Sequence, residues 1–231
     1  MNFARLKPLA AALGLVALTG CAAVSQLNAV ATPTDLYTLS PKSTFSPSLP
    51  NIPAQLVVET PSATAEVSGD QIVVKPTALQ VQYLPGVRWV DRAPLIVQKL
   101  LIESYENTNR VPAVGNSVIG LRADYYIVPE MREFQAAVPP NAGPDAALVV
   151  QVRLNVKIVE AVEDRIIASR SFEETTISAS DAAADVVSAF DEALGDVMRD
   201  SVEWSIRTIA AQPARREMPL RRSDAPDRQD E

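Results

Sequence analysis

The stretch Leu148-Val149-Val150-Gln151-Val152-Arg153-Leu154-Asn155-Val156-Lys157-Ile158 decides the fold. Every second side chain in it is apolar, and the side chains between them are mostly polar. Successive side chains of a strand point to opposite faces, so this period of two predicts a strand with one face in a core and one in water. Glu163 and Asp164 predict a turn after it, and residues 165–175 return as a partner strand, giving a β-hairpin.

A long amphipathic helix is predicted after the hairpin, over residues 180–211. We expect Ser180 to cap its start, where Asp181 and Asp185 stabilise the positive end of the helix dipole. Pro213 ends it. The apolar residues recur every three or four positions, which places them on one side of a helix: Ala183, Val187, Phe190, Leu194, Met198, Val202 and Ile206.

The chain before the hairpin predicts further strands and one more helix. Short apolar runs predict strands at 55–60, 70–75 and 79–83, and residues 94–109 predict a helix with proline in its first turn. This order predicts the fold class α/β, a single domain with a mixed β-sheet and two helices packed on it. We expect the shorter helix to bridge two parallel strands.

Residues 124–135 are also expected to be extended, but Pro129 interrupts them. Proline has no N–H to donate to a ladder, which predicts an edge strand or a bulge at this position. The uncovered face of the sheet, or the edge near Pro129, would then be free for a partner or for self-association into a homo-oligomer.

The amino terminus carries the pattern of an export signal. Arg5 and Lys7 precede an apolar segment, residues 9–18, which is too short to span a bilayer. The segment ends in Leu18-Thr19-Gly20-Cys21, which contains the only cysteine of the chain. This ending resembles the lipobox of bacterial lipoproteins, and the resemblance implies that residues 1–20 are a signal peptide and that Cys21 is lipidated, for example with palmitate.

The net charge of the mature chain is consistent with attachment to the membrane through a lipid. Without residues 1–20, 19 basic and 28 acidic residues leave a net charge of −9. An acidic chain does not suit a nucleic-acid binder, and it is not attracted to anionic lipid headgroups, so the lipid itself would hold the protein at the membrane. Ala22 follows the cysteine where an Asp would retain an enteric lipoprotein at the inner membrane, which favours the outer membrane.

Composition divides the rest of the chain. Residues 21–53 are rich in Ser, Thr, Pro and Ala and predict a flexible tether, although the alternating piece 35–39 is able to dock as an edge strand. The folded domain is expected over residues 54–212. Residues 213–231 are charged with few apolar side chains, which is typical of a disordered tail.

The chemistry of the side chains argues against an enzyme. The chain has no histidine, which excludes Ser-His-Asp and Cys-His nucleophiles and His-ligated zinc, and we predict no catalytic residue, cofactor or metal ligand. Two carboxylate pairs, Asp181 with Asp185 and Glu173 with Glu174, are better explained by helix-start charge and solvated strand ends. Trp89 and Trp204 are expected in the core rather than at a partner or lipid surface.

Several pieces resemble one family, the ABC-type transport auxiliary lipoproteins. They occur in the family's order, cover residues 36–210 and follow the lipobox. Trp204 in the last predicted helix also agrees with the pattern of this family. The pieces are Ile72-Val73-Val74-Lys75-Pro76, the run from Leu84-Pro85-Gly86-Val87-Arg88-Trp89 through Asp91 to Gln98, Arg132-Glu133-Phe134-Gln135 and Ala189-Phe190-Asp191-Glu192-Ala193.

The resemblance implies a role beside a lipid-transporting ABC system. Its partners would be an ATPase, a permease and a membrane-anchored mammalian-cell-entry (MCE) protein, and the fold would resemble the amino-terminal domain of TolB. Two alternatives remain open at this point. One is a structural or assembly lipoprotein of an outer-membrane complex; the other is a carboxylate-dependent envelope hydrolase, which requires a cleft with two facing acids.

Overall fold

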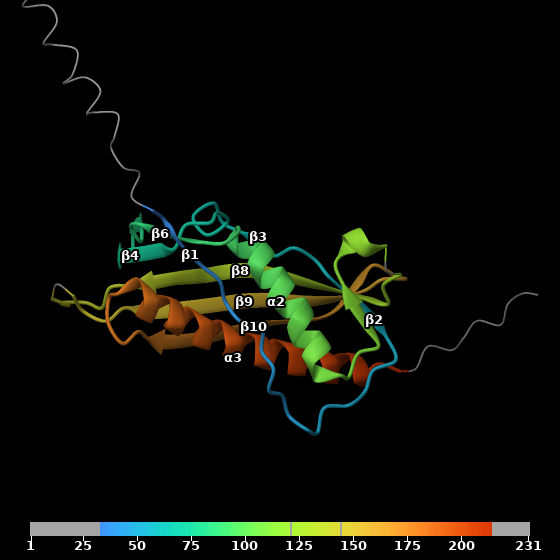
Figure 1. Cartoon of the computed structure of the whole chain (residues 1–231). Coiled ribbons are helices and arrows are strands. Elements are labelled where there is room, and N and C mark those ends of the chain that lie inside the picture. Colours follow the sequence, from blue (N-terminus) through green and yellow to red (C-terminus); the bar gives the residue numbers. More distant parts are fainter. Residues whose placement is uncertain (1–32, 121, 144, 214–231) are drawn as a thin grey trace, which may run out of the picture. The chain divides into compact units, whose positions relative to one another are not determined.

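Figure 1 shows a computed structural model that describes residues 33–120, 122–143 and 145–213. The predicted signal peptide, Cys21 and residues 214–231 of the predicted tail lie outside these residues. The elements are, in chain order, β1 (Asp35–Tyr37), β2 (Gln55–Val58), β3 (Ser62–Ala63), β4 (Val73–Thr77), β5 (Gln80–Tyr83), β6 (Val87–Trp89), α2 (Ala93–Thr108), β7 (Ala113–Gly115), the 3₁₀ helix η1 (Ser117–Ile119), β8 (Tyr125–Ala137), β9 (Val149–Glu160), β10 (Arg165–Ile177) and α3 (Ala183–Ala210).

The main sheet is mixed, as the sequence predicts. Its strand order is β10-β9-β8-β2-β7, with β3 and β4 also paired to β8, and β5 paired to β4. The β9–β10 hairpin is antiparallel over its whole length, which confirms the strand and turn predicted around residues 148–175. Strand β2 is parallel to β7 and to β8. The connection from β2 to β7 contains β3 to β6 as well as α2, so α2 directly joins β6 to β7.

Both helices cover the same face of the sheet (Figure 1). The alternating apolar side chains of β9, from Val150 to Ile158, are fully buried beneath them. The apolar residues predicted for α3 are also buried, with Ala183 at the start of the helix packed at the margin of the core. One domain with a mixed sheet and two helices is therefore confirmed.

An aromatic cluster closes one end of this core. The ring centroids of Trp89 and Phe190 lie 5.3 Å apart in an edge-to-face arrangement, and Phe134 lies 5.0 Å from Phe190. Trp89 is only 2% exposed, which confirms its predicted place in the core. Such aromatic pairs add specific packing to the area that they bury.

Pro129 does not lie at an edge, so the edge half of that prediction was wrong, while the pairing of β8 with β9 does shift register nearby, between Met131 and Glu133. Strand β8 is central, with β9 on one side and β2, β3 and β4 in turn on the other. The Ile127 carbonyl accepts a hydrogen bond from the Glu59 N–H at 2.9 Å, and backbone groups two residues apart point to the same side. The side of Pro129 that lacks an N–H therefore faces the break between β2 and β3, where no ladder bond is lost.

The start of α3 also differs from the prediction. Ala182, not Ser180, is the N-cap residue, and its side chain makes no capping bond. Ser180 lies two residues before the N-cap and still makes hydrogen bonds at the start of the helix. Its hydroxyl donates a hydrogen bond to Asp185 Oδ2 at 2.5 Å and accepts one from the Ala182 N–H at 3.1 Å. Asp185 does lie in the first turn, as predicted.

Candidate functional site

Cys21, the predicted site of lipid attachment, lies outside the described residues. The described part of the predicted tether, by contrast, is packed on the domain. Leu39, Leu49 and Ile52 are at most 5% exposed and belong to the same core as the helices. The folded unit therefore begins near Leu36 rather than at residue 54. We call residues 38–53 the strap.

The strap is held by polar side chains of both helices. The Ser40 N–H donates to Asp191 Oδ1 at 2.6 Å, and the Ser46 N–H donates to Glu203 Oε1 at 2.7 Å, both on α3. From α2, Ser104 Oγ accepts the Lys42 N–H at 3.0 Å. A segment that pairs with no strand must still satisfy its backbone N–H groups, and these side chains do so.

Lys42 connects the strap to α3 through an ion pair. Its Nζ donates to Asp196 Oδ1 at 2.9 Å, and this hydrogen bond lowers the pKa of the Asp196 carboxyl below its usual value, with a further contribution from Arg199. Gly195 lies beside this pair: a Cβ at Gly195 would be 3.8 Å from Lys42 Cδ. The close neighbour of Gly195 is the strap.

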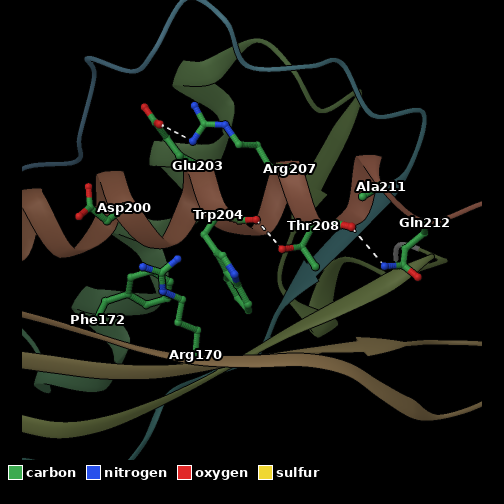
Figure 2. Close-up of a pocket in the computed structure, with 9 residues that line it drawn as sticks. All are labelled: Arg170, Phe172, Asp200, Glu203, Trp204, Arg207, Thr208, Ala211 and Gln212. Carbon is green, nitrogen blue, oxygen red and sulfur yellow. Dashed lines mark hydrogen bonds and ion pairs between the residues drawn. The ribbon is translucent and has the colours of Figure 1, made fainter.

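A cleft of about 570 Å³ opens between the C-terminal half of α3 and β10 (Figure 2). The Trp204 ring packs on Phe172 with centroids 5.5 Å apart, and the Arg170 guanidinium lies 5.1 Å from the centre of the Phe172 ring. Trp204 is thus half-buried: it packs against the core, as predicted, but also lines the cleft. Aromatic rings beside arginines are typical of the strongest contacts in protein interfaces.

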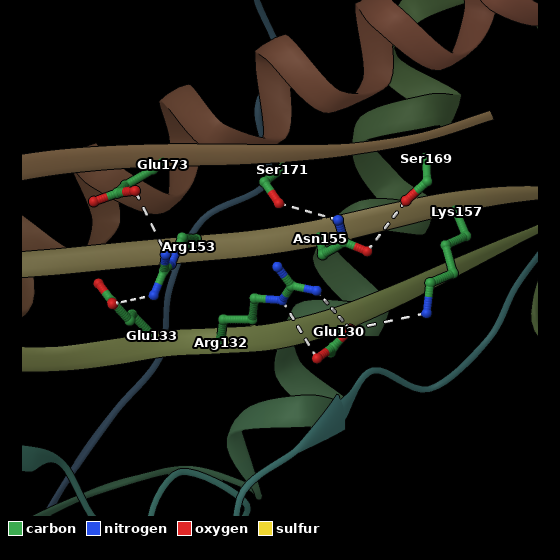
Figure 3. A network of polar contacts seen from close by, with 9 residues as sticks. All are labelled: Glu130, Arg132, Glu133, Arg153, Asn155, Lys157, Ser169, Ser171 and Glu173. Carbon is green, nitrogen blue, oxygen red and sulfur yellow. Dashed lines mark hydrogen bonds and ion pairs between the residues drawn. The ribbon is translucent and has the colours of Figure 1, made fainter.

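The face of the sheet turned away from the helices is polar (Figure 3). Arg153 pairs with Glu133 on β8, and its Nε lies 4.0 Å from Glu173 Oε2 on β10. Asn155 donates to Ser171 Oγ at 3.0 Å. Opposite charges meet across neighbouring strands, so the middle of this face is hydrated and largely neutral, while Ile177, 69% exposed and opposite Val149, lies at its end.

One carboxylate in each pair considered as catalytic has a structural partner. Asp185 accepts from Ser180, and Glu173 lies near Arg153. The cleft contains two acids, but Asp200 pairs with Arg199 at 3.1 Å and Glu203 with Arg207 at 2.9 Å. Among the described residues, no three or more His, Cys, Asp or Glu side chains gather to hold a metal ion.

Neither helix has the length and apolar character needed to cross a bilayer, as far as the described residues go. The strap is the feature that the sequence did not reveal. Its prolines and small polar residues resemble those of a linker, and its three buried apolar residues lack a period. Only Leu39, at the end of the alternating piece 35–39, gave a local signal.

Comparisons with known proteins agree with this architecture. The model of the family "ABC-type transport auxiliary lipoprotein component" matches residues 37–201, a range that includes the strap. The crystal structure of protein XCC0632 from Xanthomonas campestris, described under family DUF330, is 26% identical, covering 75% of this chain and 95% of that chain with a TM-score of 0.68. A second crystal structure, of an uncharacterized protein, shares the fold at 12% identity and a TM-score of 0.52, covering 77% and 97%.

One curated relative is also similar. The uncharacterized protein bll6063 from Bradyrhizobium diazoefficiens is 25% identical over 174 residues, or 75% of this chain. The match covers 45% of that relative, so this chain corresponds to less than half of its length. The family match spans most of the chain, from β1 to the middle of α3, and the chain therefore belongs to the family of ABC-type transport auxiliary lipoprotein components.

Proposed function

We propose that this protein is a lipid-anchored, non-catalytic subunit of an ABC-type transport system that moves lipid together with an MCE protein. Cys21 would attach it to the periplasmic face of the envelope, and the domain from Leu36 onward would contact the permease, ATPase and MCE assembly. The single observation that carries the proposal is the family match over residues 37–201.

The amino terminus supports the anchor. The lipobox ends at Cys21, and fifteen peptide units lead from it to Leu36 at the start of the folded unit. More than one acyl chain on that cysteine would give a stable attachment, since one chain alone binds only reversibly. Ala22 in place of an Asp favours the outer membrane as the site of attachment.

The side chains of the domain support a non-catalytic role. A general acid or base must reach a reacting group in its pocket, and the carboxylates of Asp200 and Glu203 in the cleft are instead held by arginines of the same helix. The aromatic floor of the cleft, formed by Phe172 and Trp204, suits contact with a partner protein better than acid–base chemistry.

The experiment is a deletion strain complemented with the full chain or with Cys21→Ser. The deletion is expected to disturb the lipid balance of the outer membrane and to lower detergent resistance. The full chain should restore both, and Cys21→Ser should leave the membrane fraction and fail to restore them. A deletion strain with normal membrane lipids and normal detergent resistance would contradict the lipid-transport role.

A further inference from the structure

Five of the nine exposed large apolar side chains among the described residues gather at one end of the domain, and the other four, Val118, Val162, Ile166 and Ile177, lie on other elements. Leu79, in the turn between β4 and β5, is 99% exposed, and Val81 and Tyr83 on β5 are 38% and 41% exposed. Leu36 on β1 and Val90 after β6 are 65% and 56% exposed. We call these five residues the apolar tip.

Hydrogen bonds join the pieces that carry the apolar tip. The Val90 N–H donates to the Tyr37 carbonyl at 2.8 Å, which places β1 beside β6. The Trp89 N–H donates to the Asp70 carbonyl at 2.8 Å, and the Leu84 N–H donates to the Ile72 carbonyl at 2.9 Å. The β4–β5 hairpin, β6 and β1 therefore form one end of the molecule (Figure 1).

The chain enters the domain at this same end. β1 begins at Asp35, and the fifteen peptide units between Cys21 and Leu36 span at most about 50 Å when fully extended. A tether of this length keeps the local concentration of the tip at the membrane high, so even a weak contact is populated. This step rests on the lipid anchor of the proposed function.

The charges near the apolar tip are mixed. Residues 71–90 contain Lys75 and Arg88 and no acidic residue, but Asp70 and Asp91 flank them and Asp35 begins β1. At the other end, Glu160 and Glu163 beside exposed Val162 both pair with Arg165. Charge alone does not separate the two ends, and the choice of the tip rests on its apolar side chains and on the tether that enters beside it.

We infer that the apolar tip contacts the surface of the bilayer that holds Cys21. Leu79 and the side chains of Val81 and Tyr83 enter the headgroup region, and Lys75 and Arg88, which pair with Glu66 and Asp70, add no net repulsion. The contact is apolar and shallow, in the manner of interfacial segments, and it depends on the anchor because the patch is small.

The contact fixes the orientation of the domain. The apolar tip and the β9–β10 turn lie at opposite ends of β8. Val74 of β4, the strand that leads into the tip, is opposite Ala136 near the end of β8. Glu160, which precedes the β9–β10 turn, is opposite Tyr125 at the start of β8. The long axis of the sheet then stands away from the membrane. The C-terminal end of α3, whose Ile209 shares a pocket with Tyr125, points away from the bilayer, toward partners.

The test uses a polarity-sensitive dye on the full chain. Cys21 is the only cysteine and its thiol is consumed by lipid, so Leu79→Cys creates a single labelling site. Val162→Cys is the matched control, because Val162 is also apolar, 71% exposed and in a turn, but at the opposite end of the sheet. Each labelled chain is reconstituted in vesicles of phosphatidylethanolamine with a minor share of phosphatidylglycerol.

We expect the dye at position 79, and not at position 162, to shift to shorter wavelength and to be quenched by spin-labelled lipid. Chains that float with the vesicles but emit as in water at both positions would overturn the inference and leave the anchor standing. A shift at position 79 that persists in detergent and rises with protein concentration would also overturn it, because a second copy then covers the tip. Failure of the chains to float would instead refute the lipid anchor.

Discussion

Lys42 Nζ lies 2.9 Å from Asp196 Oδ1, and this ion pair joins the strap to α3 across 154 positions of the chain. The pair belongs to a set of contacts in which α2 and α3 hold the segment that follows β1. The distance between the proposed anchor at Cys21 and the domain would then be set by the chain before Leu36, and not by the whole stretch up to residue 53.

The first prediction concerns the strength of this pair. A double-mutant cycle with Lys42→Met and Asp196→Asn should give a coupling of about 0.2–1 kcal/mol in urea unfolding, a modest value because both side chains are partly exposed. Lys99 and Glu103 form the control pair: their atoms lie 3.7 Å apart and Lys99 is 76% exposed, so their coupling should be smaller. Equal couplings for the two pairs would contradict this ranking.

The second prediction is a pH dependence. The hydrogen bond from Lys42 lowers the pKa of Asp196 in the folded state below the value of about 3.9 that it has when unfolded. Its stabilisation is therefore present above about pH 4 and is lost as the pH falls through the lower, folded value. Between about pH 5 and pH 2, the wild type should lose more unfolding free energy than Asp196→Asn; parallel curves would argue that the pair contributes nothing.

The third prediction concerns Gly195 in the middle of α3. Gly195→Ala should raise the free energy of unfolding by about 0.5–1 kcal/mol, because glycine costs that much in a helix interior. The added Cβ would meet only the Lys42 side chain, at 3.8 and 3.9 Å, which is ordinary contact. Gly195→Leu is the contrasting variant and should destabilise by displacing Lys42 from Asp196. A lower melting temperature for Gly195→Ala would show that the strap packs more tightly than described.

The fourth prediction concerns a buried hydroxyl pair between the two helices. Ser205 Oγ donates to the Val202 carbonyl at 2.9 Å, so the Tyr105 hydroxyl is the donor in its 2.5 Å bond to Ser205. Burial raises the pKa of Tyr105, so it remains protonated and able to donate. Tyr105→Phe should cost about 1 kcal/mol of unfolding free energy, because Ser205 loses its donor while the ring stays in place.

The matched control for that change is Tyr37→Phe. Tyr37 is a partly buried tyrosine of β1 whose contacts to the domain include the backbone bond from Val90. The unfolding free energy of the Tyr37→Phe variant should differ from that of the wild type by less than about 0.5 kcal/mol, as for most substitutions away from buried polar contacts. A Tyr105→Phe variant as stable as the wild type would mean that the buried hydroxyl pair is energetically neutral.

The elements with a strong local period were predictable. The hairpin around residues 148–175 and the helix α3 follow directly from alternation and from apolar spacing, and each is confirmed within a few residues. Trp89 was placed in the core on the burial preference of its side chain alone, and it is buried.

The features set by distant neighbours were not predictable. The strap is held by Asp191, Asp196 and Glu203, which lie more than 150 positions away and give no local signal. Pro129 suggested an edge because a sequence does not show that β2 ends and β3 begins beside it. Trp204 has both a core side and an exposed side, a division that apolar spacing alone does not reveal.

The measurement that tests the central claim most directly is a gentle detergent purification of the full chain from its own cells. A tag at the C-terminus leaves Cys21 free for lipid, and bound partners are identified by mass spectrometry, with Cys21→Ser as the unanchored control. The account predicts recovery of an MCE protein with its permease and ATPase, and their loss with Cys21→Ser. Recovery of outer-membrane assembly proteins alone would contradict it, and would make the protein a structural lipoprotein without a part in lipid transport.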